Sequence, residues 1–434
     1  MLVLGCFPLL SITQAHDAVQ EADRPRYEFV RDWNVHPCKP SQWITRVGVL
    51  ESSIEGVPAE FYILIQQPPS IVIASLSTGF TVRTIELPLK SELTGLLECV
   101  GDFDKDGVGD LALGLAGTGQ RWIEIISGID GKKLQQFQRE VDCRALGYSV
   151  CELPGRAGTG TLVVGSPSDV GIPGSAPSKY CQKGIVLLIN SSSGQKPRVL
   201  EGDMNGDGFG WFVGNIGDID SDGCADFAVG APWFPLGTES SGYLRAYSGR
   251  TARQIFTLTP ESSDSQLRGH DFGCWAAPCE DINSDKIADI IVCAPGAHFI
   301  SLRKDHQQTS GVARIFSGKD GKLLTEINSP GGFMESPFFG EQAFSIGDID
   351  GDEFPELVIS SPQEKHAGYE NGALRCYSTG PTTMRCSVIA EGPGSDLGRC
   401  LCVFKIQGTS AHSILASSGN EVVRFHVGVN GAKK

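Results

Sequence analysis

Short apolar runs alternate with turns that contain Gly or Pro along almost the whole chain. Seven of these runs resemble one another and recur about every 50–67 residues. They are Phe61–Ile65, Leu111–Leu113, Leu162–Pro167, Phe227–Val229, Ile290–Val292, Leu357–Ile359 and Ile414–Ala416. Self-similarity at this spacing is typical of propellers and solenoids, in which each repeat buries its apolar surface against the next one.

A second type of segment follows several of these runs, a strand that leads directly into a tight turn. Its examples are Ile125–Lys132, Leu244–Gly249, Arg314–Lys322 and Leu374–Ser378. The Asp-Gly pairs at Asp130 and Asp320, between alternating apolar positions, predict β-hairpins. Each unit is therefore predicted to form a four-stranded antiparallel blade, and its apolar run is the second strand of that blade.

The two ends of the chain supply one blade between them. The last unit begins near Gly398 and has room for only three strands, whereas the strand-like segment Tyr27–Val35 belongs to no other unit. Pairing the two would close the ring and remove exposed sheet edges. The sequence therefore predicts an all-β fold: a single seven-bladed propeller over residues 27–434, closed by pairing of an N-terminal strand with the last blade.

The segment before the propeller has a different composition. Residues 1–15 are mostly apolar and end in Thr-Gln-Ala, which resembles a secretory signal whose basic start is missing. Residues 16–26 form a polar linker. An ordinary hydrophobic N-terminus is the alternative. No later segment reaches the length of a membrane span, and we expect a secreted, periplasmic or cell-surface protein.

Acidic loops stand directly before four of the apolar runs. In the loop that starts at Asp218, carboxylates occupy positions 1, 3, 5 and 9 and glycine occupies position 6. Alternating carboxylates in a tight turn point toward one centre, and oxygen ligands of this kind favour Ca²⁺. Similar loops start at Asp102, Asp281 and Asp348, with Lys286 and Glu353 in the glycine position of the last two. The alternative is a set of solvated turns without metal.

Composition and charge narrow the classes of partner. The chain has 54 Gly, 24 Pro and a net charge of −15, which disfavours nucleic acid or an anionic membrane as partner. Fifteen of the 51 acidic residues lie in the four loops, so bound cations would neutralise part of the charge.

None of the 14 cysteines forms a CxxC motif. Cys376 and Cys386 lie on either side of a Gly-Pro turn and can pair in an oxidising compartment.

These motifs resemble the FG-GAP repeats of the integrin α-subunit propeller and of its bacterial, stand-alone relatives. Phe-Gly occurs at Phe209, Phe272 and Phe339, each eight residues before an acidic loop, counted from the glycine. Gly-Ala-Pro starts at Gly230, and variants of it end the other second strands. In that family each acidic loop joins strands 1 and 2 of a blade and binds calcium.

The resemblance implies up to four Ca²⁺ ions, one in each of blades 2, 4, 5 and 6. The implied side-chain ligands are Asp102, Asp104, Asp106 and Asp110; Asp218, Asp220, Asp222 and Asp226; Asp281, Asn283, Asp285 and Asp289; and Asp348, Asp350, Asp352 and Glu356. The position-7 carbonyl ligands would be Val108, Cys224, Ile287 and Phe354. Residues 51–60, 152–161 and 405–413 lack such a set and should be metal-free, and Asp203–Gly208 is expected to be a simple turn.

The chain carries no catalytic motif that we recognise: no Gly-x-Ser-x-Gly, no His-Glu-x-x-His and no phosphate-binding loop. The expected function is a calcium-stabilised module that binds a protein or glycan through the loops of its top face, opposite to the calcium loops. The alternative is a calcium-dependent polysaccharide lyase or hydrolase, for which Arg268, His270, His298 and Lys304 would be tested first. Trp211, Trp233, Phe234 and Trp275 can stack on sugars or pack between blades. The ligand and the oligomeric state do not follow from the sequence.

Overall fold

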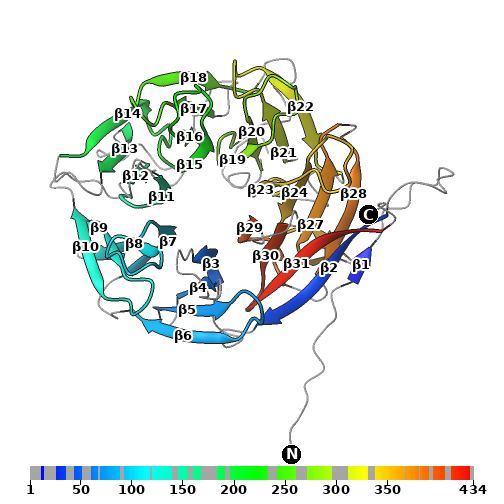
Figure 1. The fold of residues 1–434 in the computed structure, drawn as a ribbon, viewed down its shortest axis with the longest axis horizontal. Helices are drawn as coiled ribbons and strands as arrows, with labels where there is room; N and C mark the ends of the chain where they lie inside the picture. Colours follow the sequence, from blue (N-terminus) through cyan, green and yellow to red (C-terminus); the bar gives the residue numbers. More distant parts are fainter. Residues whose placement is uncertain are drawn as a thin grey trace, which may run out of the picture.

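The computed structural model describes most of the chain and all of the predicted repeats. The described residues are 11–13, 26–35, 44–50, 60–66, 69–87, 92–117, 120–138, 145–154, 160–167, 183–190, 196–232, 242–260, 271–295, 311–330, 338–366, 368–380, 382–390, 394–405 and 412–430. They form seven antiparallel blades arranged around a common axis (Figure 1), which confirms the predicted propeller. Among these residues no helix has the length and apolar character that a membrane span needs.

The first four blades follow one another in chain order. Blade 1 consists of β3 (Ile44–Leu50), β4 (Glu60–Gln66), β5 (Pro69–Ser75) and β6 (Thr81–Glu86). Blade 2 consists of β7 (Glu92–Val100), β8 (Asp110–Gly117), β9 (Gln120–Ile126) and β10 (Lys133–Gln138). Blade 3 consists of β11 (Ser149–Leu153), β12 (Thr161–Ser166), β13 (Lys183–Asn190) and β14 (Arg198–Asn205). Blade 4 consists of β15 (Phe212–Gly217), β16 (Asp226–Ala231), β17 (Tyr243–Tyr247) and β18 (Gln254–Leu258).

The last three blades include the two departures from simple repetition. Blade 5 consists of β19 (Trp275–Cys279), β20 (Asp289–Ala294), β21 (Val312–Phe316) and β22 (Leu323–Asn328). Blade 6 consists of β23 (Ala343–Gly347), β24 (Glu356–Ser361), β27 (Ala373–Ser378) and β28 (Met384–Ile389), with a small hairpin of β25 (Lys365–His366) and β26 (Tyr369–Glu370) between its second and third strands. Blade 7 consists of β29 (Leu401–Lys405), β30 (His412–Ser418), β31 (Glu421–Asn430) and β2 (Arg26–Val35).

Ring closure occurs where the sequence predicted it. Strand β2 pairs antiparallel with β31, with Phe29 opposite Val427, so the N-terminal segment supplies the outer strand of the last blade. A further short strand, β1 (Ser11–Thr13), pairs with β28 at the outer edge of blade 6. Residues 11–13 lie in the segment interpreted as a signal, and their pairing was not predicted.

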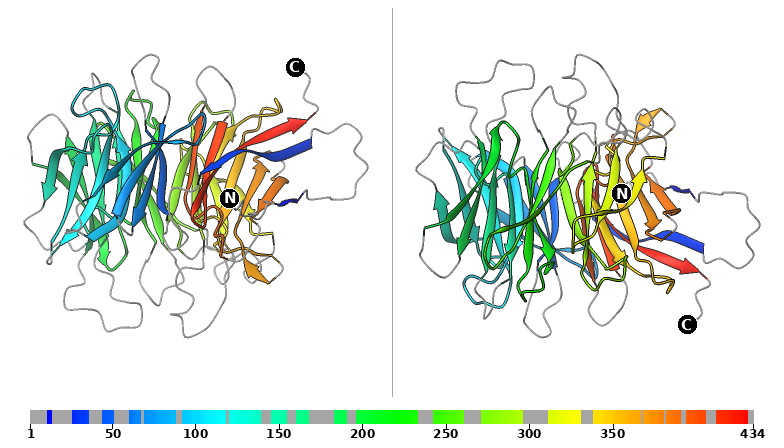
Figure 2. Two further views of the ribbon diagram at one scale, coloured as in Figure 1. Left: turned by 90° about the horizontal axis from the view of Figure 1, so that it is seen from below. Right: turned by 90° about the horizontal axis from the view of Figure 1, so that it is seen from above.

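The seven first strands lie innermost and the fourth strands outermost (Figure 1), while the strands run across the thickness of the disc (Figure 2). Each first strand contacts the first strand of the next blade, and β29 returns to β3. The second strands carry almost only buried residues because neighbouring blades cover both of their faces. This explains why they are the clearest apolar runs in the sequence.

The hydrophobic core is divided among the interfaces between blades. The described residues form seven apolar clusters, and each cluster joins one pair of neighbouring blades, including blades 7 and 1. Phe209, Phe272 and Phe339 of the Phe-Gly motifs are fully buried in these clusters. The stability of each blade therefore depends on its two neighbours.

The glycines of the repeat motif allow this close packing. Gly273 follows Phe272 with a φ of 86°, a left-handed conformation that glycine adopts without strain. Its carbonyl oxygen would lie only 1.9 Å from a Cβ atom added at Gly230 of the preceding blade. Both halves of the Phe-Gly and Gly-Ala-Pro pattern are thus explained by one contact between blades.

Candidate metal centres

The four acidic loops occupy equivalent places in four blades. They span residues 101–109, 218–225, 280–288 and 348–355, in each case between the first and second strand. Because the first strands of all blades run in the same direction, their C-terminal ends lie on one face of the disc. The structure therefore gathers the predicted loops of blades 2, 4, 5 and 6 on a single face.

The backbone of each loop wraps around its first carboxylate. In blade 4, the Asp222 N–H donates to Oδ1 of Asp218 over 3.0 Å, and the Gly223 N–H donates to Oδ2 over 2.8 Å. The loops that start at Asp102, Asp281 and Asp348 show the same two contacts. In each loop the position-5 N–H also donates to the side chain at position 3, so the side-chain oxygens of positions 1 and 3 face the same backbone group.

Position 6 needs a left-handed backbone in every loop. Gly107 and Gly223 have φ values of 91° and 82°, and Lys286 and Glu353 have similar values of 74° and 73°. The two loops without glycine therefore keep the same backbone conformation. They do so although a side chain in this region costs about 1–2 kcal/mol.

The acid at position 9 lies buried beneath each loop, at the start of the second strand. Asp110, Asp226, Asp289 and Glu356 are fully buried. In blade 4, Oδ2 of Asp226 accepts a hydrogen bond from the Ile219 N–H, and Oδ1 accepts one from the Gly249 N–H in the turn between strands 3 and 4, both over 2.9 Å. The same residue thus closes the loop and ties it to the neighbouring turn.

Burial raises the pKa of these carboxyls, because loss of hydration disfavours the charged form. The pKa is raised to about 6 for Asp110 and Asp289 and to about 7 for Glu356, and it is also raised for Asp226. Desolvation is the largest cause in each case, and the nearby loop carboxylates add to it. A bound cation would remove this penalty.

Glu356 differs from the three aspartates at position 9. Its Oε2 accepts a hydrogen bond from the Ile349 N–H over 3.0 Å. Its Oε1 is buried and has no hydrogen-bond partner among the described residues. A buried carboxylate oxygen without a donor is costly, and a cation in the loop would satisfy it.

Three loops bring together carboxylate oxygens that lie within 4.8 Å of one another. The groups are Asp102, Asp104 and Asp110; Asp218, Asp220 and Asp226; and Asp348, Asp350 and Glu356. The blade 5 loop has the same backbone contacts, with Asn283 in place of the second acid. Such oxygen-only sets suit a hard cation such as Ca²⁺, so the residues present fit the predicted ion.

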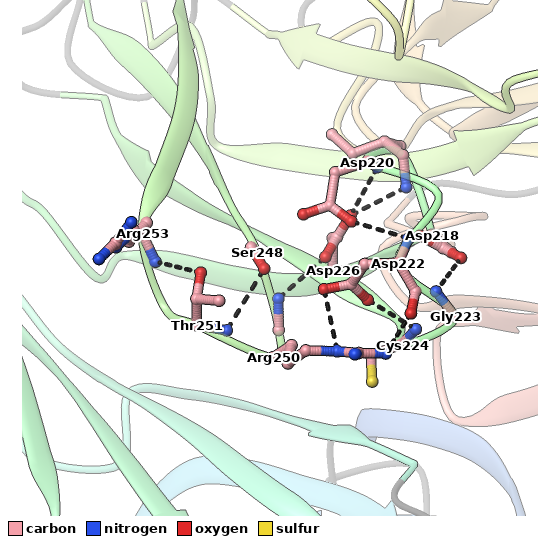
Figure 3. Close-up of polar contacts among 12 residues, drawn as sticks. Asp218, Asp220, Asp222, Gly223, Cys224, Asp226, Ser248, Arg250, Thr251 and Arg253 are labelled. Atoms are coloured by element: carbon pink, nitrogen blue, oxygen red, sulfur yellow. Dashed lines mark hydrogen bonds and ion pairs between the residues drawn. The ribbon is translucent and has the colours of Figure 1, made fainter.

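The acid at position 5 has a partner that the sequence did not reveal. In Figure 3 the Arg250 side chain lies beside Asp222, with Nε 3.2 Å from Oδ2 of the carboxylate. In blade 6, Arg385 lies 3.3 Å from Asp352, and in blade 5 the Ser317 hydroxyl donates to Asp285 over 3.2 Å. These partners come from the fourth strand or from the turn before it, so the loops of blades 4, 5 and 6 are contacted from the same side.

Position 7 contributes a backbone contact in all four loops. The N–H groups of Val108, Cys224, Ile287 and Phe354 donate to the carboxylate at position 5. The proposed role of their carbonyl oxygens as ligands stays a prediction.

The other three connections between strands 1 and 2, in blades 1, 3 and 7, were predicted to be metal-free. They lie largely outside the described residues, at 51–59, 155–159 and 406–411.

The segment Asp203–Gly208, expected to be a simple turn, is only partly one: its first three residues end strand β14, and Asp207 lies in the bend that follows. Its buried carboxylate accepts hydrogen bonds from the Asp203 and Phe209 N–H groups over 3.0 Å and from the Tyr243 hydroxyl over 2.8 Å. All of these contacts are internal, and they join blade 3 to blade 4. The carboxylate is used for structure.

The candidate sugar-binding aromatics that the structure describes pack between blades. The Trp211 ring lies 4.2 Å from that of Tyr148, measured between centroids. Trp275 lies between Phe212 and Phe344, at 5.3 and 5.4 Å. The other two aromatic candidates, Trp233 and Phe234, lie outside the described residues. So do the four residues that the enzyme alternative would test first: Arg268, His270, His298 and Lys304.

Comparison with known proteins agrees with this geometry. Residues 209–247, which contain the blade 4 loop, match the model of the FG-GAP repeat. Integrin alpha-7 of Rattus norvegicus is 27% identical over 232 residues, 51% of this chain and 19% of the relative. Integrin alpha-3 of Cricetulus griseus is 29% identical over 217 residues, 46% of this chain and 19% of the relative.

A third relative extends the aligned part. Integrin alpha-4 of Xenopus laevis is 28% identical over 279 residues, 63% of this chain and 24% of the relative. The chain thus aligns with about a fifth of the length of these integrins. The similarity to bacterial relatives stays a prediction.

Proposed function

Since this chain is an FG-GAP repeat protein that is distantly similar to the integrin α N-terminal β-propeller, we propose that it is a calcium-stabilised binding module. The proposed ligand is a protein or a glycan. The observation that carries the proposal is the set of acidic loops on one face, because cations held there would stiffen the blades. The opposite face is then left for recognition.

The proposed calcium sites follow the four loops. Each would use the side chains at positions 1, 3, 5 and 9 together with the position-7 carbonyl. Extracellular calcium modules bind with dissociation constants of about 10⁻⁴–10⁻³ M. At a free concentration ten times the dissociation constant, one site stabilises the fold by about 1.4 kcal/mol. Four sites would contribute about 5–6 kcal/mol, a large share of typical stability.

The proposed recognition face carries a small exposed hairpin in blade 6. The hairpin of β25 and β26 exposes Lys365, His366 and Tyr369. Its base is fixed because the buried Glu364 carboxylate pairs with Arg375. The hairpin lies between strands 2 and 3, at the end of the blade opposite to the acidic loop. Exposed charged and aromatic side chains on a fixed base suit a protein or glycan ligand.

The site of action and the partners are part of the proposal. Extracellular or cell-surface calcium would keep the loops occupied. The net charge of −15 disfavours nucleic acid as partner. A glycan or a protein with a basic patch would be compatible with this charge.

The test is a panel of glycans and extracellular proteins, probed with the purified chain in calcium and in EDTA. Saturable retention that depends on calcium supports the proposal. His366→Ala with Tyr369→Ala should weaken retention, whereas Ile129→Ala, an exposed apolar side chain on the calcium face, should not. Release of a cleaved product would instead support the enzyme alternative, and no retention on any member would contradict a binding module of this kind.

A further inference from the structure

Two cysteines face each other on the outer strands of blade 6. Cys376 on β27 lies directly opposite Cys386 on β28 in the antiparallel register. The two side chains are within hydrogen-bonding contact, and both are buried, with exposed fractions of 0% and 2%. The structure has no S–S bond between them. Directly opposite residues bring their Cβ atoms to about 4.5–5.5 Å, close to the separation of about 3.5–4.5 Å that a disulfide requires.

This arrangement differs from that of the other described cysteines in paired strands. Their opposite residues are Leu111 for Cys99, Val163 for Cys151, Asp289 for Cys279, Trp275 and Ala313 for Cys293, and Leu415 for Cys402. Within the described part of the chain, Cys376 and Cys386 are thus the cysteines that face each other across a strand pair. Their position points to a specific use.

The blade architecture itself does not require cysteine at these positions. Blades 4 and 5 have the same register shift just after the equivalent pair, and they place Ala246 opposite Phe256 and Ile315 opposite Thr325. In blade 6 the shift follows Cys376 directly. A bulge beside the pair gives the two strands freedom to adjust their separation.

We propose that Cys376 and Cys386 form a disulfide that cross-links the outer hairpin of blade 6. A thiolate of one cysteine attacks a small-molecule disulfide, such as oxidised glutathione, and releases one thiolate of the donor. The second cysteine then attacks the mixed disulfide and releases the other half of the donor. The protein loses two hydrogen atoms, and one donor disulfide becomes two thiols.

The cross-link must form before the blade is fully packed. Contact with Cys386 and burial both raise the pKa of the Cys376 thiol well above its usual value, so the reactive thiolate is rare in the folded state. Before packing is complete, the pair is exposed and separated by only a short hairpin. Oxidation during folding therefore has an accessible route, whereas oxidation of the folded chain is slow.

The cross-linked hairpin braces the blade 6 acidic loop. The Thr379 N–H donates to the Pro355 carbonyl over 3.1 Å, and Arg385, next to Cys386, lies 3.3 Å from Asp352. A bond between β27 and β28 fixes these groups relative to each other. The disulfide would thus limit local opening of the loop that ends at Glu356.

The test uses the wild-type chain refolded in calcium with mixed oxidised and reduced glutathione. The chain is then unfolded, its free thiols are alkylated, and it is digested without reductant for peptide mass analysis. The expected result is one linked peptide pair that contains Cys376 and Cys386 and loses two hydrogens, while the other buried cysteines are alkylated. Alkylation of both residues in a chain that had refolded under these oxidising conditions would overturn the proposal, as would linkage of either one to a different cysteine.

A stability measurement separates a structural cross-link from an incidental one. Reductant should lower the Tm of the oxidised wild type by about 3 °C, given a closed loop of about ten residues in a chain of this size. Cys386→Ala should remove this response, and Cys293→Ala, an equally buried control with no opposing cysteine, should keep it. If the wild-type chain contains the Cys376–Cys386 disulfide but its Tm does not change with reductant, the disulfide does not stabilise blade 6.

Discussion

Calcium and pH should act together on the stability of this propeller. Without calcium, the folded chain should become less stable as the pH rises from about 5.5 to about 8. The loop groups responsible include Asp110 and Asp289, with pKa values raised to about 6, and Glu356, with a pKa raised to about 7. Burial beneath the loops is the main cause of all three shifts.

The sign and size of the effect follow from proton counts. Near pH 6 the folded chain holds about two protons on these groups, whereas the unfolded chain, with the ordinary values of 3.8 and 4.5, holds almost none. Each proton released on unfolding changes the stability by about 1.4 kcal/mol per pH unit. The folded-state pKa values are the higher ones, so stability is lost as the pH rises through them. These three groups give an expected slope near pH 6 of about 2–3 kcal/mol per unit, and the buried Glu98, whose pKa burial raises to about 7, adds about 1 kcal/mol per unit.

Thermal melts in calcium and in a calcium-free buffer, at several pH values, measure this coupling. Calcium binds the ionised carboxylates, so its stabilising effect should grow over the same pH range in which the calcium-free chain weakens. The gap in Tm between the two conditions should therefore be small near pH 5.5 and large near pH 8.

A single substitution isolates one of the three groups. In Glu356→Gln the acceptor for the Ile349 N–H is kept and the titrating proton is removed. Since Glu356 holds about a third of the protons that these groups and Glu98 carry near pH 6, the slope for the calcium-free variant should fall by about a third. A calcium-free Tm that is constant or rises with pH in the wild type would refute the reasoning.

Three further substitutions test the contacts around the loops. Arg250→Ala removes a cation 3.2 Å from Asp222, so the calcium affinity of the blade 4 loop should rise about twofold to fivefold in calorimetric titration. Lys286→Gly removes a side chain from a position with a φ of 74° and should raise the free energy of unfolding in urea by about 0.5–1 kcal/mol. An unchanged free energy of unfolding would show that the Lys286 backbone is not strained. Tyr243→Phe deprives the buried Asp207 of a donor and should lower stability by about 1–3 kcal/mol in the same assay, with the Tm increment from calcium unchanged.

The fold and the loop geometry were largely predictable because their signals are local. The second strands are covered on both faces, so their apolar character is continuous in the sequence. The acidic loops bond to their own backbone within about nine residues, so spacing alone predicts their shape. Closure by the N-terminal strand followed from counting strands.

The contacts between separate segments were not predictable in the same way. Arg250 reaches Asp222 from a turn 28 residues later, and Tyr243 reaches Asp207 across 36 residues. Neither pair forms a periodic pattern. The opposition of Cys376 and Cys386 depends on the register of one hairpin, and a slip of one residue would separate them. Contacts of this kind are set by the packing of strands.

The pairing of β2 with β31 has a consequence for synthesis of the chain. Phe29 and its partner Val427 are separated by 398 residues. At about 5–20 residues per second, the ribosome needs about 20–80 s to produce the partner strand. During that interval β2 is a free strand edge, open to wrong pairing with neighbouring nascent chains. Molecular chaperones that cover the first few dozen residues would therefore raise the yield of closed rings more than those that act on the finished chain.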